Sequence, residues 1–231
     1  MAPSSPTSSA SGRIKSKERV STYGEVFTAD REVNAMLDLV KQETERIDSR
    51  FLEPACGNGN FLAKILERKL VVVRQRHAAS RPDYELYALI AAASLYGIEI
   101  LEDNVTECRT RLSDIFRDAY LALFPKADPE GDYLRSIAYV FRRNILWGDA
   151  LTLRTPDGRE AITFSEWTAV NGSGLIKRRD FELDMLLKNQ PMTGPNLFSD
   201  LGDEAFIPTP KAEYPLIHYL KIHTYADSNP L

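Results

Sequence analysis

Apolar residues recur at helical spacing through the first two thirds of the chain, and short apolar runs of strand length separate the helical segments. This periodicity predicts helices over residues 33–40, 61–76, 82–95, 105–119 and 133–142. Three short runs predict strands over residues 50–54, 96–101 and 144–147. Strands that alternate with helices indicate a parallel sheet. Three strands are about half of a doubly wound sheet, so we expect an α/β fold with an incomplete parallel sheet and helices on both faces.

The alternation stops after Leu151. The pattern beyond it predicts an isolated strand over residues 161–170, a short helix over 179–187 and a last element over 217–225. The chain begins with the serine- and proline-rich stretch MAPSSPTSSAS, which cannot bury enough apolar surface to offset the entropy of ordering it. The basic stretch that follows it, KSKER, extends this solvated tail. We therefore divide the chain into a disordered tail (1–20), an α/β domain (21–152) and an irregular C-terminal extension (153–231).

Composition narrows the class of protein. The chain has 231 residues, of which 43% are hydrophobic and 27% charged, as in ordinary globular proteins. No apolar run approaches the roughly 20 residues of a membrane span, and the first residues lack the apolar segment of a secretory signal. Two cysteines are typical of a reducing compartment. We expect a cytoplasmic protein without a membrane partner, and its net charge of −4 means that nucleic acid would be contacted through a local basic patch or a partner.

A glycine turn, Gly57-Asn58-Gly59, follows the first predicted strand. A dinucleotide-binding turn would need a third glycine where this chain has Leu62, and no Lys-Ser/Thr pair follows to hold a triphosphate. The turn alone could be purely structural. Residues 53–62, however, read EPACGNGNFL, which closely resembles the motif (D/E)-P-A-C-G-x-G-x-F-L of gamma-class adenine-N6 DNA methyltransferases. Type I and type IIG restriction-modification methylases share this motif.

The resemblance implies a Rossmann-like methyltransferase domain over residues 21–152 that binds S-adenosyl-L-methionine. In the family, the first acid of the motif holds the amino end of the cofactor, the acid after the second strand binds the ribose, and the acid after the third strand accepts from the adenine amino group. A segment before the first helix, G-E-x-[FY]-T-P, grips the methionine carboxylate. Residues 23–29 resemble that segment, although Ala29 replaces its proline. The implied cofactor-binding residues are Tyr23, Thr28, Glu53, Pro54, Ala55, Cys56, Gly57, Asn58, Gly59, Phe61, Glu99, Ile100, Asp149 and Ala150.

The catalytic motif of the family, (N/D/S)-P-P-(Y/F), is missing. Residues 189–192 (NQPM) and 229–231 (NPL) do not match it. The resemblance therefore implies that no catalytic residue lies in this chain. Nor does the spacing of the histidines or of Cys56 and Cys108 indicate a metal site. The cluster Lys177-Arg178-Arg179 has two interpretations, as a contact to DNA phosphates or as a solvated start of a helix.

Three functional hypotheses remain. The first is the S-adenosylmethionine-binding subunit of a split adenine-specific DNA methyltransferase, in which a partner chain with an N-P-P-Y motif supplies the catalytic strand and the recognition of double-stranded DNA. The second is a catalytically inactive methyltransferase fold that serves as a binding or regulatory protein. The third is a methyltransferase that acts on a substrate other than DNA. We favour the first, and expect the partner to dock on residues 162–181, where Phe164, Trp167, Leu175, Ile176 and Phe181 supply apolar surface.

Overall fold

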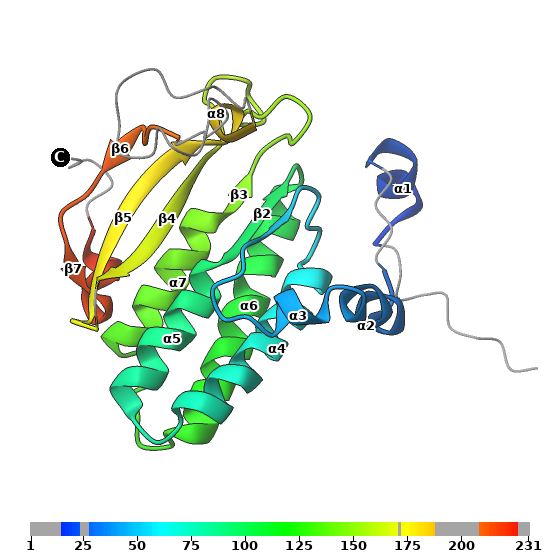
Figure 1. Ribbon diagram of the computed structural model, residues 1–231. Helices are drawn as coiled ribbons and strands as arrows, with labels where there is room; N and C mark the ends of the chain where they lie inside the picture. Colours follow the sequence, from blue (N-terminus) through cyan, green and yellow to red (C-terminus); the bar gives the residue numbers. More distant parts are fainter. Residues whose placement is uncertain (1–14, 24–27, 171, 188–207, 226–231) are drawn as a thin grey trace, which may run out of the picture.

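The computed structural model describes residues 15–23, 28–170, 172–187 and 208–225 (Figure 1). None of the helices in these ranges is both long and apolar enough to cross a membrane. The elements follow in the order α1 (Lys17–Tyr23), α2 (Asp30–Asp38), α3 (Lys41–Thr44), β1 (Phe51–Glu53), α4 (Asn60–His77), α5 (Arg81–Ala93), β2 (Leu95–Glu99), α6 (Glu102–Leu123), α7 (Asp132–Asn144), β3 (Ile145–Trp147), β4 (Thr163–Val170), β5 (Leu175–Glu182), α8 (Leu183–Leu187), β6 (Ala212–Glu213), β7 (Ile217–His218) and the 3₁₀ helix η3 (Tyr219–Thr224).

The first three strands form a parallel sheet in the order β1-β2-β3, which confirms the predicted mixed α/β architecture. Glu53 at the end of β1 pairs with Gly97, and Glu99 at the end of β2 pairs with Trp147. Because all three strands run the same way, their carboxyl ends meet at one edge of the sheet. The central strand β2 is buried at every position, as expected for a parallel strand covered on both faces.

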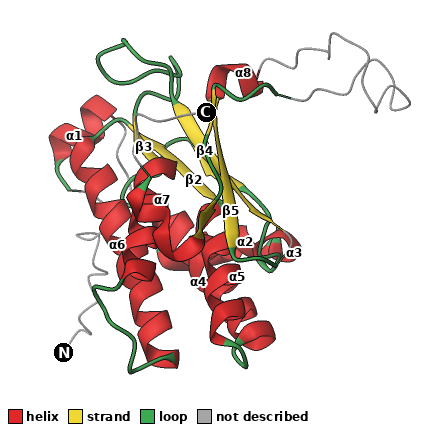
Figure 2. Ribbon diagram, turned by 90° about the vertical axis from the view of Figure 1, so that its left-hand side faces the viewer, coloured by secondary structure: helices red, strands yellow, loops and turns green. Residues whose placement is uncertain are grey.

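Four helices cover one face of this sheet. Helices α4 to α7 pack against one another, and each of them contacts the central strand β2 (Figure 2). Helix α4 begins at Gly59, whose φ of 86° is left-handed, and a Cβ on Gly59 would lie only 2.6 Å from the Cys108 Sγ of α6. Helix α5 begins at Ser80, whose hydroxyl accepts a hydrogen bond from Asp83 N, the usual arrangement of an N-cap.

The other face of the sheet is covered by strands, so the prediction of helices on both faces is wrong for the described residues. Strands β4 and β5 form an antiparallel hairpin, and β6 and β7 both pair with β5. The β2 side chains Tyr96 and Ile98 pack in one cluster with residues at the open end of this hairpin, Ile162, Phe164 and Leu183. The Tyr96 and Phe164 rings meet edge to face at 5.1 Å between centroids.

The segment predicted as an irregular extension therefore contains a second sheet. The strand predicted over residues 161–170 is not isolated, and the predicted helix over 179–187 is wrong except for α8, because β5 runs to Glu182. The inward positions of β5 are Ile176, Arg178 and Asp180, which are at most 3% exposed. Two of these three are charged, so the alternation of a strand is hidden from a search for apolar periodicity.

The side chains proposed as a docking surface are buried within the chain. Trp167, Phe164, Phe181 and Ile176 are all at most 7% exposed. Trp167 lies between Tyr139 of α7 and Tyr225, at 6.2 Å between ring centroids in both cases. The prediction that these residues face a partner is corrected for Trp167 and Ile176, which pack in one core cluster with residues of α5 and α7.

The N-terminal tail contains a helix, so the prediction of disorder over residues 1–20 is wrong for residues 17–20, which belong to α1. Lys15 and Arg19 form ion pairs with Asp103 at the start of α6, and these contacts hold the segment against the domain. The other part of that prediction, residues 1–14, lies outside the described residues.

Candidate functional site

A cavity of about 600 Å³ opens where the three parallel strands end. This is the edge at which open α/β sheets bind ligands, and the volume is typical of a small-molecule site. Of the residues predicted to bind a cofactor, those that line the cavity are Thr28, Glu53, Pro54, Ala55, Cys56, Gly57, Asn58, Phe61, Glu99, Ile100, Asp149 and Ala150. Gly59 lies behind the turn at the start of α4, and the side chain of Tyr23 lies outside the described part of the chain.

Backbone amides hold the carboxylates of Glu99 and Asp149 in place. Glu99 is 7% exposed; its Oε2 accepts from Gly57 N and its Oε1 from Leu101 N, both at 2.9 Å. Asp149 Oδ1 accepts from Leu151 N at 2.8 Å. An ionised carboxylate has about four acceptor sites. Both groups therefore keep the capacity to accept hydrogen bonds from a ligand while their orientation is fixed by the chain.

The cavity is acidic. None of the residues that line it is a lysine or an arginine, and none of its three carboxylates forms an ion pair with a described residue. Burial raises the pKa of Glu53, and a backbone hydrogen bond from Ala55 offsets part of this effect. A ligand with a positive charge and several hydroxyl or amine donors suits such a cavity, whereas a phosphate would be repelled.

The glycine turn brings backbone close to the cavity. Gly57 and Gly59 have φ angles of 52° and 86°, a region that side chains strongly disfavour. Cys56 N donates to Ile98 O at 2.9 Å and Gly59 N donates to Cys56 O at 2.8 Å, so the turn is anchored to β2 and closed on itself. The conformation explains why glycine occupies both positions of the Gly57-Asn58-Gly59 turn.

Ile100 presents an apolar surface to the cavity and is 43% exposed. Trp147, at the end of β3, donates its indole N–H to Ile100 O at 2.9 Å and thereby fixes the loop after β2. Such a surface suits the face of a flat ring. Trp147 was not predicted as a site residue, because its contact depends on the β2–β3 pairing.

Thr28 reaches the cavity from the other side. Its carbonyl oxygen accepts a hydrogen bond from Asn60 Nδ2 at 3.1 Å, which ties the segment before α2 to the first residue of α4. Residues 24–27 of the predicted carboxylate-gripping segment lie outside the described residues. Leu101, the alternative to Ile100 as the apolar neighbour of a flat ring, also lines the cavity. The lining residues that were not expected from the sequence are Asn60, Asn104, Gly148 and Leu151. Asn60 and Asn104 stand in the first turns of helices that follow strands, and this position was the signal that could have found them.

The cysteines have a packing role. Cys56 and Cys108 are both free and buried. Contact with Cys108 and burial together raise the pKa of the Cys56 thiol, so it stays protonated under the turn. Among the described residues, no group of three potential metal ligands from His, Cys, Asp and Glu occurs.

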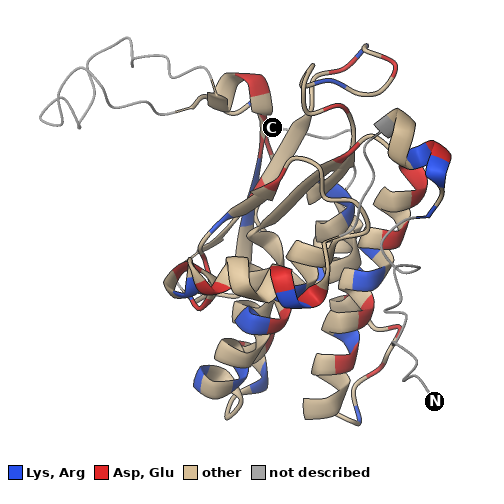
Figure 3. Ribbon diagram, turned by 90° about the vertical axis from the view of Figure 1, so that its right-hand side faces the viewer, with Lys and Arg blue, Asp and Glu red and all other residues tan. Residues whose placement is uncertain are grey.

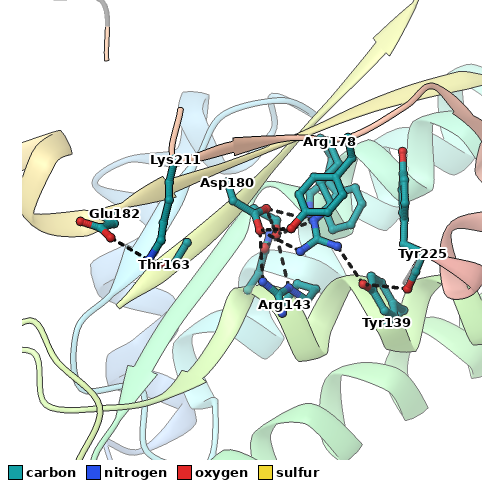
Figure 4. A network of polar contacts seen from close by, with 12 residues as sticks. Tyr139, Arg143, Thr163, Arg178, Asp180, Glu182, Lys211 and Tyr225 are labelled. Atoms are coloured by element: carbon teal, nitrogen blue, oxygen red, sulfur yellow. Dashed lines mark hydrogen bonds and ion pairs between the residues drawn. The ribbon is translucent and has the colours of Figure 1, made fainter. Parts of the chain in front are cut away.

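The structure contradicts the interpretation of Lys177-Arg178-Arg179 as a solvated start of a helix, because these residues lie in β5. Arg178 is fully buried and donates to Asp180 through both Nε and Nη2, at 2.9 and 2.8 Å (Figure 4). Lys177 pairs with Glu213, and Arg179 pairs with Glu166. The cluster belongs to a strand and its charges are matched within the chain.

Comparison of this chain with protein-family profiles, with curated proteins and with solved structures returned no match.

Proposed function

We propose that this chain is the S-adenosylmethionine-binding subunit of a split adenine-specific DNA methyltransferase, with a Rossmann-like methyltransferase fold. The observation that carries the proposal is the meeting of Glu53, Glu99 and Asp149 in one cavity at the ends of three successive parallel strands. The cofactor would supply a methyl group on a sulfonium. Its ammonium, ribose hydroxyls and adenine amine are all donors, and the cavity offers acceptors without a competing cation.

The chain's own residues would bind and orient. Glu53, at the end of β1, would attract the ammonium group, and its raised pKa reflects a charge that is poorly solvated before a ligand arrives. Glu99 would accept from the ribose, Ile100 would cover the flat ring, and Asp149 would accept from its amine. These roles follow from the order of the acids along the sheet edge and from the resemblance to the methylase motif.

The free edge of β1 supports a partner that completes the site. Among the described strands, β1 pairs only with β2, and Leu52 on β1 is 45% exposed. Beside it lies a groove of about 230 Å³ whose apolar lining residues include Leu52, Tyr96, Phe164, Phe181, Leu183 and Leu186. A strand added to β1 by β-augmentation would gain backbone hydrogen bonds and an apolar pocket. It would also end near Glu53, where a catalytic N-P-P-Y segment has to stand.

Calorimetric titration of the isolated chain with S-adenosylmethionine tests the proposal. We expect binding, and we expect Glu99→Ala to weaken it by about 1.5–3 kcal/mol, the usual cost of losing hydrogen bonds to a charged acceptor. Glu102→Ala removes an exposed carboxylate three residues away that does not line the cavity, and it should bind like the unaltered chain. Absence of binding, alone and with a partner, would refute the proposal.

The isolated chain should not methylate DNA, because no residue of the catalytic motif is present to hold the target amine in line with the sulfonium. The measurement is transfer of tritiated methyl groups to duplex DNA by the chain alone and with a co-expressed N-P-P-Y protein. Transfer by the chain alone would show that catalysis does not need a partner.

The second candidate is an inactive methyltransferase fold that binds the cofactor for regulation. It is favoured by the hairpin β4–β5, which covers one face of the sheet without a partner. A monomer that binds S-adenosylmethionine but co-purifies with no N-P-P-Y protein would favour this candidate over the split enzyme.

A further inference from the structure

A continuous polar path connects the N-terminal segment to the glycine turn. Lys15 Nζ lies 2.5 Å from Glu107 Oε2 of α6, and Asn58 Nδ2 in the turn donates to the other oxygen, Glu107 Oε1, at 3.0 Å. Lys15 also donates to Asn104 Oδ1 at 2.6 Å, and Asn104 lines the cavity. Glu107 thus joins the N-terminal segment and the glycine turn, which lie 92 and 49 residues before it in the chain.

The chemistry of Glu107 fixes how the Asn58 amide is turned. An ionised carboxylate only accepts hydrogen bonds, so the NH₂ end of the amide must face it. The pKa of Glu107 is lowered, since the hydrogen bonds from Lys15 and Asn58 outweigh the effect of burial, and the group therefore stays ionised. The opposite end of the amide, Asn58 Oδ1, is buried and has no hydrogen-bond partner among the described residues. Among the described residues, the hydrogen bond to Glu107 is therefore what fixes the Asn58 side chain.

We propose that Glu107 is a positioning residue of the ligand site: held by Lys15, it holds the Asn58 amide and so fixes the conformation of the glycine turn that lines the cavity. The identity of this ligand as S-adenosylmethionine rests on the proposed function. The path itself does not, because it is built from contacts within the chain.

A second ion pair lies beside the path and provides a matched control. Arg19 donates to both carboxylate oxygens of Asp103, at 2.7 and 3.1 Å, so Asp103 holds α1 to α6, whereas Glu107 holds Lys15 just before α1. Figure 3 colours the basic and acidic positions along the backbone. Asp103 does not contact Asn58. Removing Asp103 loosens α1 without touching the turn, whereas removing Glu107 releases both Lys15 and the turn.

The test is a double-mutant cycle on S-adenosylmethionine affinity with Glu107→Ala and Asn58→Ala. Each single change should raise Kd about 5–20-fold, and the double variant should bind like Asn58→Ala alone, because Glu107 acts through Asn58. Asp103→Ala should change Kd by less than about 2-fold. Additive effects of Glu107→Ala and Asn58→Ala, or an equal loss in Asp103→Ala, would overturn the positioning role.

A ligand-free measurement separates this inference from the proposed function. In ¹⁵N spectra of the free protein, the Asn58 side-chain NH₂ resonance should shift and exchange faster with water in Glu107→Ala and in Lys15→Gln, while Asp103→Ala leaves it unchanged. An unchanged resonance in Glu107→Ala overturns the inference whatever the ligand. If the unaltered chain does not bind S-adenosylmethionine, the proposed function fails, and this resonance still decides whether Glu107 holds the amide.

Discussion

The two sheets of the molecule treat buried carboxylates in opposite ways. At the end of the parallel sheet, Glu99 is held by backbone amides and faces a cavity without a cation. In the antiparallel sheet, Asp180 is 3% exposed and is surrounded by Arg178, Arg143, Ser165 and Tyr214, all within 3.2 Å of its oxygens. The carboxylate of Glu99 remains available to a ligand, whereas the carboxylate of Asp180 is paired with arginine inside the fold.

This difference separates a candidate site from a structural network. The guanidinium of Arg178 also lies 4.0 Å from the centre of the Tyr214 ring and donates to the Tyr139 hydroxyl at 2.8 Å. Each charged side chain of β5 thus forms an ion pair within the chain, and these pairs, together with the contacts of Asp180 and Arg178, hold β5 to β6 and α7. The acids of the parallel sheet are satisfied only in part, which is the condition under which a bound cation or donor gains most.

The largest expected effect is the loss of the neutralised acid. Asp180→Ala leaves Arg178 buried without its carboxylate, and removing one partner of a buried ion pair typically costs about 3–5 kcal/mol. Urea denaturation of the variant should show this loss. Glu45→Ala, which removes an exposed i,i+4 partner of Lys41, should stay within about 0.5 kcal/mol. Equal stability of the two variants would mean that Asp180 is not structural and would break the comparison.

A somewhat smaller loss is expected at Trp167, which packs the hairpin on α7. Trp167→Ala should lower the free energy of unfolding by about 3 kcal/mol, within the usual range for removing a buried tryptophan. Trp147→Ala is the matched control in a chain with two tryptophans, because Trp147 is 43% exposed. If Trp167→Ala left the isolated chain equally stable but weakened a complex, the hairpin would be a docking surface after all.

The parallel half of the fold could be predicted because its pattern is apolar. Helices α4 to α7 repeat apolar residues at helical spacing, and the three short strands stand between them as apolar runs. The hairpin could not be predicted in the same way. Arg178 and Asp180 occupy inward positions of β5, and only the pairing with residues far away in the sequence makes burial of these charges possible.

In the candidate site, too, some features could be predicted from local sequence and others depend on contacts between distant segments. The positions of Glu53, Glu99 and Asp149 followed from the ends of predicted strands, since parallel strands bring their carboxyl ends together. The contact of Lys15 with Glu107, and that of Glu107 with the glycine turn, depend on how the N-terminal segment meets α6. No local sequence pattern indicates this contact, and the basic residues of the tail were expected to be solvated.

The smallest effect is expected at Glu53, where stability and ligand binding should change in opposite directions. Since the pKa of Glu53 is raised in the folded chain, the folded state holds more protons than the unfolded state between the ordinary pKa of 4.5 and the raised value. Stability therefore falls as pH rises through this window, and Glu53→Gln should stabilise the free protein at neutral pH by about 0.5 kcal/mol, a small gain because the carboxylate is partly exposed. Below pH 4.5 the gain should vanish.

Affinity for a cationic ligand should show the reverse dependence, decreasing in the unaltered chain as pH drops through the raised pKa and becoming independent of pH in Glu53→Gln. Thermal unfolding and ligand titration across pH 4–8 measure both quantities on one pair of proteins. A Glu53→Gln variant that is less stable at neutral pH would show that Glu53, like Asp180, is an acid on which the stability of the fold depends.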